Sequence, residues 1–213
     1  LVAHFPGDGP RVMLFTHMDQ LGFIVRQIEA DGLIRLERLG GVPERALAAQ
    51  EVLICVGEGL DVSGIIANKS HHATTPSEKN QVMPYAELYV DTGLSSTSEV
   101  EAAGIRIGSP VVYAPQALEL GDSRICGTSI DDRAGCAVLL EVARLLKNRT
   151  SGPPVDLAFT VLEEFNLRGA LPLAQNLLPD IAIQLDLMLA TDTPDMEARG
   201  EMVLGGGPGM SMY

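Results

Sequence analysis

The sequence is poor in basic residues and has no long apolar run, and each shortage excludes a class of protein. Its 15 Lys and Arg stand against 28 Asp and Glu, which gives a formal net charge of −13. Phosphate backbones and anionic membrane surfaces are held by clustered Lys and Arg, so we expect neither nucleic acid nor membrane as a partner. No apolar stretch approaches the length of a membrane span.

Cysteine is also scarce. Cys55, Cys126 and Cys136 form no CxxC pair, and their odd number does not suggest a disulfide framework, so a reducing cytoplasm fits best. The chain opens at Leu1 without a basic-then-apolar leader, so we expect no signal peptide. With 213 residues, 46% of them hydrophobic, it can bury a substantial core as one large domain or two modest ones.

The stretch from Gly127 to Lys147 predicts the central helix of the protein. Apolar residues recur every three or four positions, at Ala134, Val138, Val142 and Leu145/Leu146, as they do on one face of a helix. Asp131 and Asp132 stand directly ahead of this face, at the helix N-terminus. The simpler interpretation of the acidic pair is a helix cap that interacts favourably with the helix dipole. The alternative is a metal site.

The continuous apolar run from Arg11 to Thr16 predicts a buried strand. It leads into His17, Met18 and Asp19, an arrangement in which the histidine can bind a metal ion while the aspartate orients its ring. A lone histidine after a strand is more often structural or exposed, so this motif alone does not decide between the two interpretations.

The chain changes character between Leu21 and Val111. Short apolar runs separated by Gly, Asp and Ser predict a compact β-rich module, with one short helix within Ser95 to Gly108. His71 and His72 lie in a polar loop of this module. Neighbouring side chains on an extended chain point in opposite directions, so we interpret both as exposed loop residues.

Two further apolar runs, Val155 to Leu162 and Ile181 to Leu185, predict strands, and Leu167 to Leu178 predicts a helix between them. This alternation predicts an α/β fold, a mostly parallel sheet flanked by helices with the small β-rich domain inserted. Ligands bind beyond the carboxyl ends of parallel strands.

Ligand-type residues stand at several of these ends. They are His17, Glu163, Glu164 and Asp186 after the strands, with Asp131 and Asp132 at the helix start. A two-metal hydrolytic site needs a carboxylate that bridges both ions, further ligands, and a separate carboxylate that takes a proton from water. The Glu163-Glu164 pair can supply one ligand and one base, although a solvated turn is the simpler interpretation of that pair by itself.

Four segments resemble, in order, the leading motifs of the glutamyl and tetrahedral aminopeptidase family. They are THMDQLGFIV (16–25), GTSIDDRAGCAVLLEV (127–142), VLEEFNLRGA (161–170) and LDLMLATDTPD (185–195). The resemblance implies an enzyme that uses two divalent metal ions, zinc or cobalt, to hydrolyse N-terminal residues from peptides. It also implies a zinc-peptidase-like catalytic domain in two parts, residues 1–20 and 112–213, around a β-rich dimerisation domain, residues 21–111.

The resemblance implies roles for single residues as well. His17, Glu164 and Asp186 would be terminal metal ligands, and Asp131 would bridge the two ions. Glu163 would be the general base, and Asp19 would orient His17. In the wider clan the peptide bond after the bridging aspartate is cis. Family members form homo-oligomers in which dimers assemble into a hollow tetrahedron of twelve subunits.

The chain departs from the family pattern in one ligand. The family's last metal ligand is a histidine downstream of the Asp186 motif, whereas no histidine follows His72 in this sequence. We therefore expect the second metal to lack a ligand here, and these residues to be an internal part of a longer protein. Two alternatives to an aminopeptidase stay open, namely a related metal-dependent amide hydrolase such as a deacylase, and a catalytically incomplete subunit.

Overall fold

The computed structural model describes residues 1–57 and 59–211 and shows two compact units. The first comprises Leu1–Met18, Asp131–Thr160 and Asn176–Tyr213, and the second comprises Asp19–Ile130 and Val161–Gln175. The domain boundaries after residues 20 and 111 stay predictions. Within the described part of the chain, no helix is long and apolar enough to cross a membrane.

The first unit contains a four-stranded sheet in the order β1-β11-β2-β12. Its strands are β1 (Val2–Phe5), β2 (Val12–His17), β11 (Val155–Thr160) and β12 (Ile181–Gln184). The last three run parallel to one another, as the sequence predicted, but β1 pairs with β11 in the antiparallel direction. The sheet is therefore mixed: three of its four strands run parallel, as expected, and the antiparallel edge strand β1 was not expected. In the sequence VAHF of β1, His4 interrupts the apolar residues, so β1 lacks the continuous apolar run from which the other three strands are predicted.

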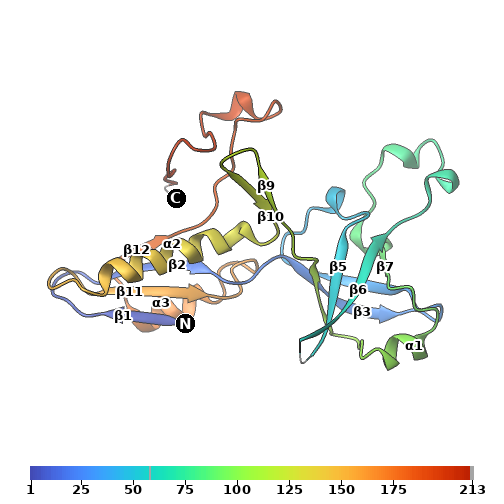
Figure 1. The fold of residues 1–213 in the computed structure, drawn as a ribbon, viewed down its shortest axis with the longest axis horizontal. Coiled ribbons are helices and arrows are strands. Elements are labelled where there is room, and N and C mark those ends of the chain that lie inside the picture. The colour runs from blue at the N-terminus through green and yellow to red at the C-terminus, as the bar shows by residue number, and fades with distance from the viewer. Residues whose placement is uncertain (58, 212–213) are drawn as a thin grey trace. The chain divides into compact units, whose positions relative to one another are not determined.

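Helix α2 (Ile130–Leu146) lies along this sheet (Figure 1). Leu139 of α2 is completely buried and belongs to one apolar cluster with Val155, Leu157 and Phe159 of β11. The apolar face predicted from the helical period is therefore only partly right. Val142 and Leu146 pack against this cluster, whereas Val138 and Leu145 are 50% and 79% exposed, so the packed face is turned toward Leu139. This packing holds the start of α2 near the carboxyl end of β2.

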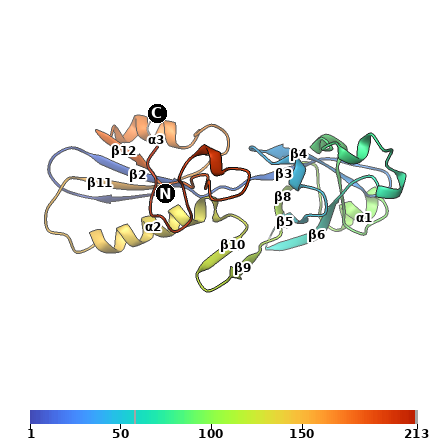
Figure 2. The same cartoon turned by 90° about the horizontal axis from the view of Figure 1, so that it is seen from above.

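The second unit contains a closed six-stranded barrel in the order β3-β4-β7-β6-β5-β8 (Figure 2). Its strands are β3 (Gly22–Ile28), β4 (Ile34–Leu39), β5 (Glu51–Gly57), β6 (Leu60–Ala67), β7 (Tyr89–Asp91) and β8 (Pro110–Tyr113). Alternate residues such as Phe23 and Val25 on β3, or Val52 and Ile54 on β5, fill the interior, because successive strand side chains point to opposite faces. Closure depends on β8 pairing with both β3 and β5.

The remaining elements are short. They are α1 (Thr97–Ala102), α3 (Ala170–Leu177), the hairpin of β9 (Ala117–Leu120) and β10 (Arg124–Gly127), and the 3₁₀ helices η1 (Glu44–Ala46), η2 (His71–Ala73), η3 (Glu78–Asn80), η4 (Tyr85–Glu87) and η5 (Glu197–Arg199). Helix α1 lies within the predicted range and starts with a cap, because the Ser96 hydroxyl accepts the Glu99 N–H at 3.3 Å. His71 and His72 are exposed. The β9-β10 hairpin was not predicted.

The packing of α2 predicts that truncating two neighbouring leucines lowers the free energy of unfolding by very different amounts. Leu139→Ala removes a fully buried side chain and should lower the free energy of unfolding by about 2–5 kcal/mol. Leu140→Ala, the matched control, removes a side chain that is 55% exposed and should cost about 0.5 kcal/mol or less. Urea unfolding followed by far-UV circular dichroism measures both. Equal losses would contradict the assigned helix orientation.

Candidate metal centre

The central strand of the first sheet ends in two buried polar residues. β2 lies between β11 and β12, and its last residues, Thr16 and His17, are each 1% exposed. His17 lies opposite Thr160, the last residue of β11. The carboxyl edge of the parallel strands therefore carries a buried imidazole.

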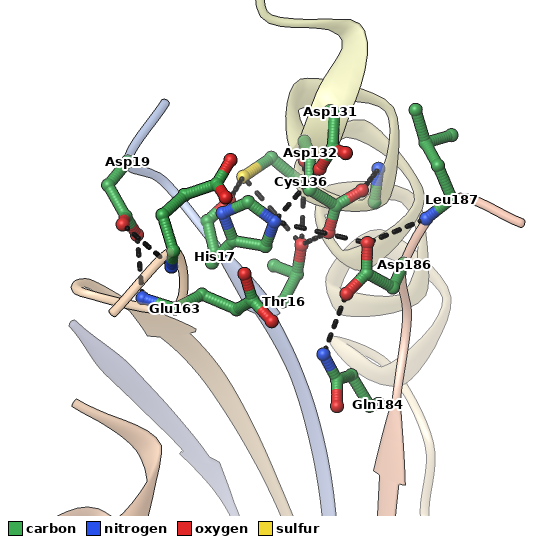
Figure 3. Close-up of polar contacts among 12 residues, drawn as sticks. Thr16, His17, Asp19, Asp131, Asp132, Cys136, Glu163, Gln184, Asp186 and Leu187 are labelled. Atoms are coloured by element: carbon green, nitrogen blue, oxygen red, sulfur yellow. Dashed lines mark hydrogen bonds and ion pairs between the residues drawn. The ribbon is translucent and has the colours of Figure 1, made fainter. Parts of the chain in front are cut away.

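Carboxylates from two other elements approach this imidazole (Figure 3). His17 Nε2 lies 3.0 Å from Asp131 Oδ1, at the start of α2, and 3.9 Å from Asp186 Oδ1, just after β12. The possible ligand atoms of His17, Asp132 and Asp186 all lie within 4.8 Å of one another. One imidazole nitrogen with several carboxylate oxygens is a donor set that zinc and similar divalent ions accept, so these residues fit such an ion.

The two adjacent aspartates have different surroundings. The Asp132 side chain is almost fully buried, and its Oδ1 accepts the Gly135 N–H at 2.9 Å while its Oδ2 accepts the Thr16 hydroxyl. A side-chain oxygen that accepts a backbone N–H three residues later is the usual helix N-cap. The Asp131 side chain is 56% exposed and meets His17. The cap interpretation therefore describes Asp132, whereas the Asp131 carboxylate lies against His17.

Burial also affects the proton affinity of the capping carboxylate. Desolvation raises the pKa of Asp132 above its ordinary value, and the nearby Asp186 carboxylate acts in the same direction. Hydrogen bonds from Thr16 and Gly135, together with the proximity of His17, oppose this rise in pKa. The peptide bond between Asp131 and Asp132 is cis, as the resemblance implied.

The acidic residues expected to complete the site belong to the second unit. Asp19 Oδ1 accepts the backbone N–H of Glu163 at 3.2 Å, and Asp19 Oδ2 accepts that of Glu164 at 3.4 Å. Leu162 and Asn166, on either side of this pair, have φ angles of 59° and 64°. Such left-handed backbone in residues other than glycine costs about 1–3 kcal/mol and is found often at functional sites. Asp19 therefore anchors the backbone of the Glu163-Glu164 pair, a contact that sequence reasoning missed.

Sequence reasoning also missed three residues around Asp132, namely Thr16, Gly135 and Cys136. Thr16 is the last residue of the apolar run that predicts β2, and that run gives its hydroxyl no role. A Cβ added to Gly135 would lie 2.3 Å from Asp132 Oδ2 and 2.6 Å from Thr16 Oγ1. The sequence did hold a signal here, because glycine inside a helix is unfavourable and usually marks a close approach.

Comparison with known proteins decides the family. The sequence model of the M42 glutamyl aminopeptidases matches residues 1–213. The chain belongs to the M42 family. The family resemblance predicted from its four motifs is confirmed, and M42 aminopeptidases depend on metal ions.

Relatives within the M42 family agree with this assignment. Lysyl aminopeptidase of Pyrococcus furiosus is 32% identical, and the match covers 100% of this chain and 60% of that protein. The TET aminopeptidase of a marine sediment Thaumarchaeota archaeon is 32% identical with a TM-score of 0.87, over 95% of this chain and 57% of that one. The TET1 peptidase of Pyrococcus horikoshii can assemble into a tetrahedron or a large octahedral shell. It is 27% identical with a TM-score of 0.77, and the match covers 87% of this chain and 55% of that one. This M42 chain thus spans less than two thirds of the length of these relatives.

The crowding around Asp132 predicts an inverted effect of a helix substitution. Replacing glycine by alanine inside a helix ordinarily stabilises it by about 0.5–1 kcal/mol. Gly135→Ala should instead lower the free energy of unfolding by about 1–3 kcal/mol, because the new methyl group displaces the Asp132 carboxylate. Thermal unfolding compares the variant with the parent protein. A stabilised variant would contradict the close packing of Asp132.

Proposed function

We propose that the protein to which this chain belongs is a metal-dependent aminopeptidase that hydrolyses N-terminal residues from peptides. The supporting observation is the approach of the Asp131 and Asp186 carboxylates to the buried His17 imidazole, at 3.0 and 3.9 Å, in a chain of the M42 family. The names of the lysyl and TET aminopeptidase relatives support the same reaction.

The cofactors proposed for this site are two divalent ions, zinc or cobalt. His17, Asp131 and Asp186 would hold them, with Asp131 as the bridging ligand, and the family resemblance adds Glu164. The hydrogen bonds already made by both Asp132 oxygens favour Asp131 over Asp132 as the bridge. When bound, such ions polarise a carbonyl group and lower the pKa of water toward neutrality.

The remaining chemistry falls to the chain's own carboxylates. Glu163 is proposed as the general base, which takes a proton from the attacking water and returns it to the leaving amine. Asp19 supports this role, because it accepts the backbone N–H groups of both Glu163 and Glu164 and so positions the pair. The proposed role of Asp19 in orienting His17 rests on the family resemblance.

The proposed partners are peptides with a free N-terminus and further copies of the same chain. Assembly into a dimer and then a dodecamer follows the family resemblance, and the assembly of the TET1 relative supports it. The net charge of −13 argues against a polyanionic partner. A cytoplasmic location is proposed from the cysteine usage.

Release of amino acids from peptides tests the proposal directly. We expect the metal-loaded protein to release residues one at a time from an unblocked peptide and to leave its N-acetylated form intact. Chelation should abolish release, and added zinc or cobalt should restore it, because the ligands bind metal reversibly. Removal of the acetyl group would indicate a deacylase. A metal-loaded protein inactive on both peptides would indicate a catalytically incomplete subunit.

Glu163→Gln tests the division of roles within the acidic pair. We expect the rate of peptide cleavage to fall by about 10²–10⁴-fold, because the amide cannot accept the proton. Metal content, measured by elemental analysis, should equal that of the parent protein. The matched control is Glu141→Gln, on an exposed part of α2, which should keep full activity. Loss of bound metal in Glu163→Gln would mean that Glu163 is a ligand.

A further inference from the structure

Thr16 is not among the ligand or base residues proposed above, yet its side chain lies beside them. We propose that Thr16 is a positioning residue of the metal centre, whose hydroxyl fixes the Asp132 carboxylate and thereby places Asp131 at His17. This inference rests on the proposed metal-dependent function. It concerns residues of the first unit only.

Two consecutive residues of β2 make polar contacts with two consecutive residues at the start of α2 (Figure 3). The Thr16 hydroxyl donates to Asp132 Oδ2, and His17 Nε2 lies 3.0 Å from Asp131 Oδ1. The strand end and the helix start are therefore joined at two points. Movement of Asp132 at one point would carry Asp131 with it, because the two aspartates share a peptide bond.

The Asp132 carboxylate has little freedom to move. It is 1% exposed, and each oxygen accepts a hydrogen bond, Oδ1 from Gly135 N–H and Oδ2 from Thr16. The space beside it is closed, since Gly135 has no room for a Cβ. Loss of the Thr16 hydroxyl would leave a buried carboxylate oxygen without its donor, which is costly in an interior. The carboxylate would then turn away or admit water, and its neighbour would shift.

The backbone of β2 is held at the same place by other groups. The Cys136 thiol donates to the carbonyl oxygen of His17 at 3.3 Å, and the Thr160 hydroxyl donates to that of Thr16 at 2.9 Å. These contacts fix the strand end without touching the aspartates. Thr160 is buried at the end of the neighbouring strand, so it provides a matched control with the same side chain in a similar environment.

The test compares three variants for metal binding and folding. Thr16→Val keeps the shape of the side chain and removes the hydroxyl, Thr16→Ser keeps the hydroxyl, and Thr160→Val removes a hydroxyl bound to backbone. Cobalt(II) affinity is measured by titration against a competing chelator, and the visible absorption of the bound cobalt reports its ligand geometry. Thermal unfolding of the metal-free proteins reports folding.

We expect Thr16→Val to weaken cobalt binding by about 10–100-fold, as substitutions behind metal ligands commonly do, and to change the cobalt spectrum. Thr16→Ser should restore both affinity and spectrum. Thr160→Val should lower the unfolding temperature while leaving affinity and spectrum unchanged. Thr16→Ala removes the hydroxyl and the methyl group and puts no apolar group beside the Asp132 carboxylate. It should reproduce the loss of cobalt affinity and replaces Thr16→Val if that variant folds poorly.

Unchanged cobalt affinity in a folded Thr16→Val or Thr16→Ala variant would overturn the positioning role while leaving the proposed function intact. An equal loss of affinity in Thr160→Val would overturn it too, because the effect would then follow from general loosening of the strand. Failure of the parent protein to bind cobalt would overturn the proposed function together with this inference.

Discussion

The candidate metal centre depends on the hydrogen bonds of the buried Asp132 carboxylate. This carboxylate links the end of β2 to the start of α2 by accepting from Thr16 and from Gly135 N–H. A buried carboxylate is tolerated only when its oxygens are paired. The requirement for pairing therefore fixes the geometry of the helix start, and Asp131 meets His17 as a consequence.

The apolar packing of the first unit holds α2 and the sheet together, and so maintains the contact between Asp132 and Thr16. Leu139 and the β11 side chains form an apolar cluster that holds α2 on the sheet, and close-packed interiors permit little sliding. The polar groups lie where the parallel strands end, which is the usual place for ligands in such sheets. The apolar contacts thus supply stability, and the polar edge carries the candidate metal ligands.

The second unit contains a separate core and the backbone contacts of Asp19 with Glu163 and Glu164. Its barrel has a core of its own, built from alternate strand residues, and closure leaves few free strand edges. Asp19 lies at the beginning of this unit and binds the backbone of Glu163 and Glu164. One aspartate close in sequence to His17 thereby organises an acidic pair that lies more than a hundred residues later, in a turn with left-handed backbone.

The sequence by itself determined α2 from its helical period and β2, β11 and β12 from their continuous apolar runs, because both patterns are local properties of the chain. Its four motifs also identified the M42 family and placed ligand-type residues after strands. Only the tertiary structure decided which aspartate caps α2 and which meets His17, how β1 pairs, and that the second sheet closes into a barrel. These outcomes depend on contacts between distant residues, such as Thr16 and Asp132, 116 positions apart. No local pattern encodes such a contact, because it exists only once strand and helix have packed together.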